Sequence, residues 1–428
     1  MKKTVVIGSG FAGLTAASYL SNNNSKIQLL ESSPKPGGRA YSFKDKETGA
    51  VIDNGQHILM GCYKETLKFL KLIGADNNLI RQNSLSLNLI KENFEICEIK
   101  APHLPYPLNL ISAFLSYSAV SFYEKMLFLK FFGKLCFCSD TELKKLSVME
   151  WLRKEKQTDN LIKSFWEILA IGALNADINK VSAKLFADIL KEIFFRGNNA
   201  ATIILPSFGL TETYCYGALK FIENRNGEVS FSEQVTDLVI NNNQVVEIIT
   251  TERTIKDFDY IISAVPLYNL KEILKSDYFL NDLSLDYSSI LSIHIFLKEN
   301  RFEDTFYGLI GSPVQWIFNK GTHLTIVISN ADAYMEMSKE DIFRIVIKEL
   351  KKYILLDKSE VESYKIIKEK RATFIPSNAI LDKRPGPVTP YKNLFLAGDW
   401  INTGLPATIE GAVKSGKLAA EAVLNLNS

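Results

Sequence analysis

Residues 4–13 read Thr4-Val5-Val6-Ile7-Gly8-Ser9-Gly10-Phe11-Ala12-Gly13, an apolar run that ends in three spaced glycines. Gly8 allows a tight turn after a strand, Gly10 lets backbone N–H groups approach a pyrophosphate, and Gly13 lets the next helix pack against the sheet. The helix N-terminus, with Phe11 and Ala12, carries about half a positive charge toward the phosphates. The stretch therefore predicts a dinucleotide-binding βαβ unit.

The second strand of this unit, Ile27-Gln28-Leu29-Leu30-Glu31, ends in a carboxylate at the distance expected for a ribose ligand. Gly37, Gly38 and Arg39 follow, in a loop that can return along a phosphate chain. Arg39 would supply a fixed cationic fork for phosphate or ribityl oxygens. The alternative is a surface turn with a solvated arginine.

The C-terminal part contains a second set of cofactor signals. An apolar strand, 393–397, stops at Gly398-Asp399, and a helix rich in small residues begins near Ala407, Thr408 and Ile409. The positive end of that helix would point at a bound cofactor. The alternative is a helix that packs for structural reasons alone.

Together, Glu31 with Gly38-Arg39 and the strand that ends at Gly398-Asp399 resemble the flavin amine oxidase and phytoene desaturase superfamily. The resemblance implies an α/β fold, with a Rossmann-like, glutathione-reductase-like FAD-binding domain interleaved with an α+β substrate domain. It also implies that Asp399 faces the flavin ribityl or pyrophosphate and that the backbone near Val235 contacts adenine. Gly55 and Gln56 would run beside the isoalloxazine ring.

Composition narrows the class of protein further. The 428 residues are 46% hydrophobic and carry a net charge of +2, so nucleic acid is not expected as a partner. The cysteines are odd in number and form no CxxC pair, which favours a reducing cytoplasm and predicts no metal site: Cys62, Cys97, Cys136, Cys138 and Cys215. Because the last of them is far from the C-terminal flavin segment, we expect non-covalent FAD. Lys2 and Lys3 precede the glycine fingerprint and not a signal peptide, so no export is expected.

The order of segments predicts interleaved domains. The FAD-binding domain is expected to comprise 1–80, 208–270 and 388–428. The substrate domain is expected to comprise 81–207 and 271–387.

One passage of the substrate domain, 101–137, is unusually apolar, since Ala101 to Tyr123 contain no charged residue. Its prolines argue against a membrane-spanning helix. Two interpretations remain: core helices of the substrate domain, or a surface that lies on the bilayer and opens to a lipid tunnel. On the second interpretation Lys125, Lys130 and Lys134 would face lipid head groups, whereas on the first they form an ordinary solvated stripe.

The stretch 51–61, with Asp53, Gly55, Gln56 and His57, and the stretch 403–416 together resemble the hydroxysqualene dehydroxylases of bacterial hopanoid gene sets. The resemblance implies reductive removal of an allylic hydroxyl from a C30 isoprenoid, giving squalene, with hydride from reduced FAD. His57 is the best candidate acid, because a partly buried imidazole titrates near neutrality. Asp53 would orient the His57 ring or favour its charged form. Glu410 is a second candidate acid, but its position at the start of a helix favours a capping role. A purely structural His57 is the alternative.

Two other functions remain open. A carotenoid-type desaturase would use oxidised FAD on a polyene and would need no acid near the flavin. An isoprenoid escort protein on the same fold would bind prenyl groups without redox chemistry and would have a degraded flavin site. For either enzyme we expect a long isoprenoid substrate, and the dehydroxylase also needs an electron donor that the sequence does not identify. The expected location is cytoplasmic, with peripheral contact at the inner face of the cell membrane.

Overall fold

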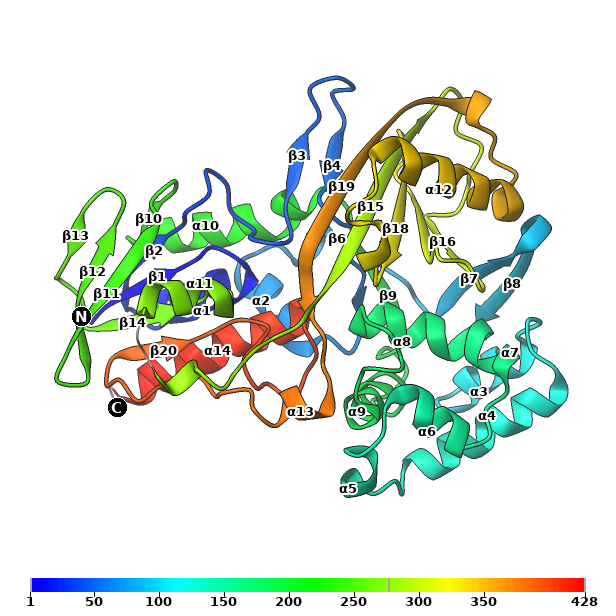
Figure 1. The fold of residues 1–428 in the computed structure, drawn as a ribbon, viewed down its shortest axis with the longest axis horizontal. Helices are drawn as coiled ribbons and strands as arrows, with labels where there is room; N and C mark the ends of the chain where they lie inside the picture. The colour runs from blue at the N-terminus through cyan, green and yellow to red at the C-terminus, as the bar shows by residue number, and fades with distance from the viewer. Residues whose placement is uncertain (1, 276–277, 427–428) are drawn as a thin grey trace.

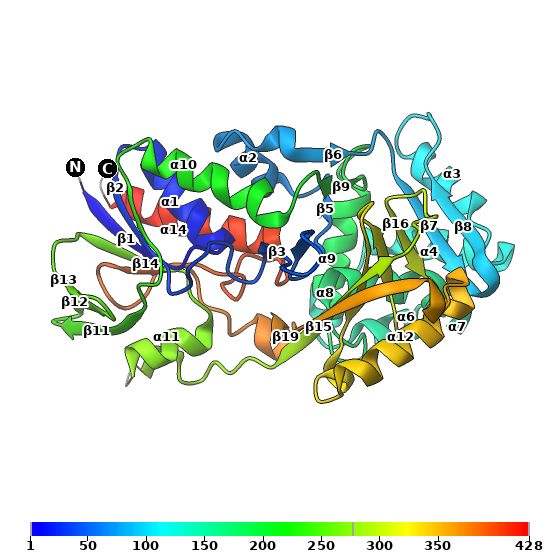
Figure 2. The same cartoon turned by 90° about the horizontal axis from the view of Figure 1, so that it is seen from above.

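The structure, a computed structural model, describes residues 2–275 and 278–426. A parallel sheet lies at one end of an elongated molecule and a larger mixed sheet at the other, joined by two long strands (Figures 1 and 2). Both termini lie at the end with the parallel sheet (Figure 1). The predicted ranges also include residues 1, 276–277 and 427–428, which lie outside the described residues.

The parallel sheet has five strands in the order β10-β2-β1-β14-β20, drawn from three distant parts of the chain. Its strands are β1 (Lys3–Ile7), β2 (Lys26–Leu30), β10 (Glu228–Ser230), β14 (Tyr260–Ser263) and β20 (Leu394–Leu396). Apart from the short edge strand β10, they are mostly buried and apolar, as expected for strands covered on both faces. The predicted α/β fold with a Rossmann-like sheet is confirmed.

Helices and a small antiparallel sheet cover the two faces of the parallel sheet (Figure 2). The helices are α1 (Phe11–Asn22), α10 (Tyr216–Glu223), α11 (Leu267–Leu274) and α14 (Ile409–Asn425). The small sheet comprises β11 (Val235–Asn241), β12 (Gln244–Thr250) and β13 (Thr254–Ile255). α1 and α14 approach closely, because a Cβ on Gly416 would lie 2.1 Å from the carbonyl oxygen of Ala12.

The mixed sheet has seven strands in the order β19-β15-β18-β17-β16-β7-β8, and α12 (Lys339–Ile354) packs on it. Its strands are β7 (Ser86–Lys91), β8 (Glu95–Lys100), β15 (Tyr287–Leu297), β16 (Phe306–Leu309), β17 (Trp316–Asn319), β18 (Leu324–Ser329) and β19 (Val361–Phe374). The parallel pair β7–β16 joins strands from the two ranges predicted for the substrate domain. The domain boundaries themselves stay a prediction.

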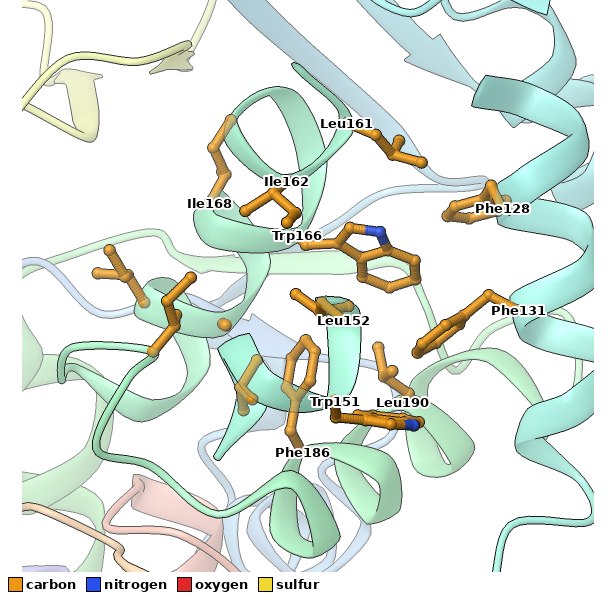
Figure 3. Packing of buried hydrophobic residues seen from close by; sticks show 14 of the residues in the cluster. Phe128, Phe131, Trp151, Leu152, Leu161, Ile162, Trp166, Ile168, Phe186 and Leu190 are labelled. Atoms are coloured by element: carbon orange, nitrogen blue, oxygen red, sulfur yellow. The ribbon is translucent and has the colours of Figure 1, made fainter. Parts of the chain in front are cut away.

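A lobe of helices packs beside this sheet (Figure 1). It contains α3 (Leu108–Ser116), α4 (Phe122–Leu135), α5 (Asp140–Leu143), α6 (Val148–Lys154), α7 (Asp159–Leu161), α8 (Glu167–Leu174) and α9 (Ala183–Phe194). Ser121 and Ser147 start α4 and α6 with capping boxes. The lobe is centred on Trp166, which lies against Phe128 and Phe131 (Figure 3). Its indole Nε1 donates to Gln157 at 2.9 Å.

Short elements connect these parts. They are β3 (Ser42–Lys44), β4 (Val51–Asp53), β5 (Leu59–Met60), α2 (Lys64–Leu72), β6 (Leu79–Arg81), β9 (Ile203–Pro206) and α13 (Asn378–Leu381). Among the residues that the structure describes, no helix has the length and apolarity needed to cross a bilayer. The apolar passage 101–137 instead forms α3 and α4, whose inner faces contribute Phe114, Phe128 and Phe131 to the core of the lobe.

Candidate active site

A single continuous cavity of about 1520 Å³ extends from the parallel sheet into the helical lobe. All the predicted cofactor residues except Gly13 line it: Gly8, Gly10, Phe11, Ala12, Glu31, Gly38, Arg39, Gly55, Gln56, Val235, Gly398, Asp399, Ala407, Thr408 and Ile409. The fold therefore brings these residues together from three separate stretches of sequence.

The turn between β1 and α1 has the geometry of a phosphate cradle. Gly8 has φ +101°, and a Cβ on Gly13 would lie 1.9 Å from the Gly8 carbonyl oxygen, so the helix can approach the turn only with glycine there. Gly10 and Gly38 lie against each other in the cavity wall: a Cβ on Gly38 would lie 3.3 Å from the Gly10 Cα, so the absence of both side chains keeps this part of the wall open. α1 has no side-chain cap and no acidic residue in its first turn. Its free N–H groups are suited to a pyrophosphate.

Glu31 lies at the end of β2 and is buried. Its Oε2 accepts hydrogen bonds from the Ser9 N–H and hydroxyl, both at 2.7 Å, and its Oε1 accepts from the Ser33 N–H at 2.8 Å. These contacts fix the carboxylate beside the glycine turn, where it lines the cavity. The position suits a ribose diol.

Arg39 connects the N-terminal loop to the C-terminal part of the site. Its Nη2 donates to Asp399 Oδ1 at 2.7 Å, and its Nη1 donates to the Ala372 carbonyl at 2.9 Å. Gly398, with φ +140°, turns the chain before Asp399, and its N–H donates to Ser415 Oγ at 2.8 Å. A solvated surface arginine, the alternative for Arg39, does not match this pairing.

Glu410 binds the start of another helix. Its Oε1 accepts from the Glu65 N–H, and its Oε2 accepts from the Thr66 N–H and hydroxyl, at 2.7–2.9 Å. Burial raises the pKa of this carboxyl above its ordinary value, against the effect of these hydrogen bonds. The carboxylate thus satisfies the free amides of α2 and ties that helix to α14. This geometry fits the capping role expected for Glu410. The carboxyl group of Glu410 is therefore not part of the proposed acid chemistry.

His57 lines the cavity beside Gln56 and is half-buried. Burial lowers the pKa of its imidazole, Arg39 lowers it further, and Asp53 acts in the opposite direction. Asp53 itself is buried outside the cavity lining, where its Oδ1 accepts from the Ser42 hydroxyl at 2.7 Å and the Leu210 N–H at 3.0 Å. Among the described residues no hydrogen bond joins Asp53 to His57. Asp53 therefore acts on His57 by charge and does not orient its ring.

The far half of the cavity is apolar and aromatic. Side chains from the helical lobe and the mixed sheet line it, including Leu110, Phe114, Phe128, Phe132, Phe165, Leu169, Phe194, Trp316 and Phe318. Ring pairs such as Phe128 and Phe165, 5.0 Å apart and edge-to-face, form its wall. Such a tunnel accepts a long hydrocarbon and offers it few polar partners.

Asn175 lies where the two halves meet, and the sequence analysis did not identify it. It ends α8 with φ +47° and lines the cavity. Its Nδ2 donates to Thr373 Oγ1, and its Oδ1 accepts from the Asn330 N–H, both at 2.9 Å. It joins the helical lobe to β19. An asparagine directly after an apolar helix is a known C-terminal signal, but the sequence does not indicate its partners.

Comparisons with known proteins agree with this site. Residues 11–424 match the family described as flavin containing amine oxidoreductase. The chain is 27% identical to a hydroxysqualene dehydroxylase of Zymomonas mobilis subsp. mobilis, over 99% of this chain and 100% of that one. It is 23% identical to a 15-cis-phytoene desaturase of Synechococcus elongatus, over 99% and 96%. An oxidoreductase structure from Methanosarcina mazei has the same fold, with a TM-score of 0.71, 17% identity and coverage of 99% and 100%.

The family match extends over nearly the whole chain and includes both glycine-rich ends of the cavity. The uncapped α1, the side-chain-free wall of Gly10 and Gly38, and the Arg39–Asp399 pair fit a bound dinucleotide. The predicted cofactor, FAD, is thereby confirmed. The chain belongs to the flavin-containing amine oxidoreductases and is an FAD-dependent oxidoreductase.

Proposed function

We propose that the protein removes an allylic hydroxyl from a C30 isoprenoid, most specifically hydroxysqualene, and yields squalene. The continuity of the phosphate cradle with an aromatic tunnel is the observation that carries this proposal. The full-length similarity to a hydroxysqualene dehydroxylase supports it. A role in squalene and hopanoid biosynthesis belongs to the same proposal.

The reaction balances with one hydride and one proton. The allylic C–O bond breaks, a C–H bond forms at that carbon, and the oxygen leaves as water after it takes up the proton. FAD, when bound and reduced, supplies the hydride, and it must be reduced again by a donor that is still to be identified. The protein binds and orients the chain, excludes water and delivers the proton.

His57 is the proposed proton donor, because it is the histidine that lines the cavity next to the residues assigned to the flavin. Its lowered pKa makes the imidazolium a stronger acid than an exposed histidine, and it also makes that form scarce at pH 7. Protonation of the hydroxyl therefore becomes more frequent as the pH falls.

A desaturase acting on a polyene is the second candidate, supported by the similarity to a phytoene desaturase and by the same apolar tunnel. A non-catalytic escort is disfavoured, because the cofactor cradle retains Gly10, Glu31, Arg39 and Asp399 in one cavity. The two enzymes differ in the direction of electron flow, which an experiment can separate.

The experiment is an anaerobic single turnover with photoreduced FAD and hydroxysqualene in detergent, followed by flavin absorbance and product extraction. Flavin reoxidation with squalene as product supports the dehydroxylase. A flavin that stays reduced, together with desaturation of phytoene by the oxidised enzyme, contradicts it and supports the second candidate.

The outer faces of α3 and α4 are the proposed contact with a membrane. They and the residues after α4 expose large apolar side chains, among them Leu108 at 56%, Phe122 at 74% and Phe137 at 89%. Ile111 and Gly133, on the same two helices, line the cavity. A hydrocarbon loses about 0.8 kcal/mol per CH2 when it leaves an apolar phase for water, so delivery from a bilayer is favoured. The expected location, cytoplasmic and peripheral at the inner face of the cell membrane, is part of this proposal.

A further inference from the structure

Arg384 lies between α13 and β20 and is 5% exposed. Its guanidinium donates to four backbone carbonyls. Nε donates to Trp400 at 3.1 Å, Nη1 to Leu405 at 2.8 Å, and Nη2 to Asp399 at 3.0 Å and also to Ile401. Among the described residues no carboxylate forms a hydrogen bond with Arg384, although side chains of this type are rarely buried without one.

All four carbonyls belong to the segment 398–405, which leads from β20 toward α14. Most of this segment lines the cavity, including Gly398, Asp399 and Trp400. Backbone bonds tie the same part of the chain to the residues that follow Arg384, since the Asn402 N–H donates to Pro385 and the N–H of Leu396, at the end of β20, donates to Pro387, both at 2.8 Å. Arg384 thus fills the inside of the turn that presents Asp399.

The direction of these hydrogen bonds matters for an anionic cofactor. In a planar trans peptide the C=O and the N–H point in opposite directions, so a carbonyl of Asp399 held by Arg384 directs the Trp400 N–H away from Arg384. Carbonyl oxygens, which would repel phosphate, are drawn inward. Within the described part of the chain the Trp400 N–H has no partner and is left as a donor for the other side of the turn, whereas the N–H groups of Ile401 and Asn402 already donate to the carbonyls of Gly398 and Pro385.

The charge acts in the same direction. Burial lowers the pKa of Arg384 to about 10, and Asp399 opposes this effect. The group is therefore still protonated at neutral pH. It lies over the ring of Phe374, with its central carbon 5.0 Å from the ring centroid. A fixed cation thus stands behind the cofactor turn in a place shielded from solvent.

We propose that Arg384 is a positioning residue for FAD, which holds the turn 398–405 in its binding conformation before the cofactor arrives. The inference rests on the flavin cofactor and not on the identity of the substrate. Arg384 belongs to none of the sequence motifs that indicate the cofactor site.

The test compares FAD affinity of refolded apoprotein, by flavin fluorescence, in wild type, Arg384→Lys and Arg384→Gln. Lysine keeps the charge but cannot donate to four carbonyls. We expect FAD affinity to fall at least tenfold in both variants, and further in Arg384→Gln. Leu350→Ala, a fully buried change on α12 outside the cavity, is the control for lost stability. It should lower the melting temperature and leave FAD affinity unchanged.

Wild-type affinity in both Arg384 variants, or an equal loss in Leu350→Ala, would overturn the proposal. Hydrogen exchange of wild-type apoprotein gives a second test that needs no variant. Slow exchange of the hydrogen-bonded Ile401 and Asn402 amides before FAD is added is expected, because the turn is already formed. Fast exchange that slows only when FAD binds would show that the cofactor, and not Arg384, orders the turn.

Discussion

The phosphate end of the cavity and its aromatic end differ in how much each single residue matters. At the phosphate end the fit depends on individual backbone positions, such as Gly13, whose Cβ would overlap the Gly8 carbonyl. At the aromatic end many rings share one wall, and losing one leaves the others in contact. Binding of the cofactor thus depends on a few individual residues, whereas binding of the substrate depends on the overall shape of the apolar tunnel.

The largest expected effect lies at the glycine turn, where Gly13→Ala should abolish FAD binding and all turnover with it, and where a second substitution, Gly10→Ala, separates folding from binding. Gly13→Ala forces an overlap inside the protein and should cost about 1–3 kcal/mol of stability as well as FAD binding. Gly10→Ala meets only the Gly38 Cα, at 4.0 Å, so the fold should be kept while FAD affinity falls at least tenfold. Thermal melts and FAD titration of both apoproteins check this. If the two variants lose the same stability and the same FAD affinity, the turn is not the phosphate site.

His57 provides the next test, at the boundary between the two halves. His57→Gln should lower the single-turnover rate about 10²–10⁴-fold without loss of FAD. In the wild type, the fraction of imidazolium grows as the pH falls toward a pKa below 6.5. The rate should therefore rise with falling pH and level off only below that pKa, and the variant should lack this rise. A pH-independent wild-type rate would assign His57 a structural role.

Gly133 tests the tunnel with a smaller effect. A Cβ there meets nothing within 4 Å, although the residue lines the cavity. Gly133→Trp should narrow the opening and lower kcat/KM for the isoprenoid at least tenfold, or 1.4 kcal/mol, with FAD affinity unchanged. Gly133→Ala is the matched control, which keeps the opening and stabilises α4 by about 0.5–1 kcal/mol. If the tryptophan variant turns over normally, the substrate uses another route.

The smallest effect is expected at the outer surface. The double variant Phe122→Ser, Phe137→Ser should weaken binding to vesicles of phosphatidylcholine and phosphatidylglycerol in equal parts by about fivefold, because two partly inserted rings are lost. Leu355→Ser, at a side chain 59% exposed beyond α12, is the control and should bind as the wild type does. Co-sedimentation measures both. No difference between them would argue against α3 and α4 as the membrane face.

The two halves were also unequally predictable from sequence. Gly8, Glu31 and Asp399 belong to local patterns with fixed spacing, so the cofactor, the α/β fold and the class of enzyme followed from them. Arg384 could not be found in this way, because its partners are defined only by the folded turn. The hydrogen bond that the Thr66 N–H donates to Glu410 joins residues 344 positions apart. The sequence predicted a capping role for Glu410, but it could not identify the helix that Glu410 caps. The residues of the tunnel wall form no sequence motif, because any apolar side chain of suitable size can fill such a position.

The most direct test of the account is a crystal structure of the FAD-loaded protein with hydroxysqualene. We predict the diphosphate at the N-terminus of α1, against the wall formed by Gly10 and Gly38, and the hydrocarbon along the aromatic wall of the helical lobe with its hydroxyl near His57. FAD outside the cradle, or a hydrocarbon bound anywhere except this tunnel, would contradict the claim that one cavity serves both molecules.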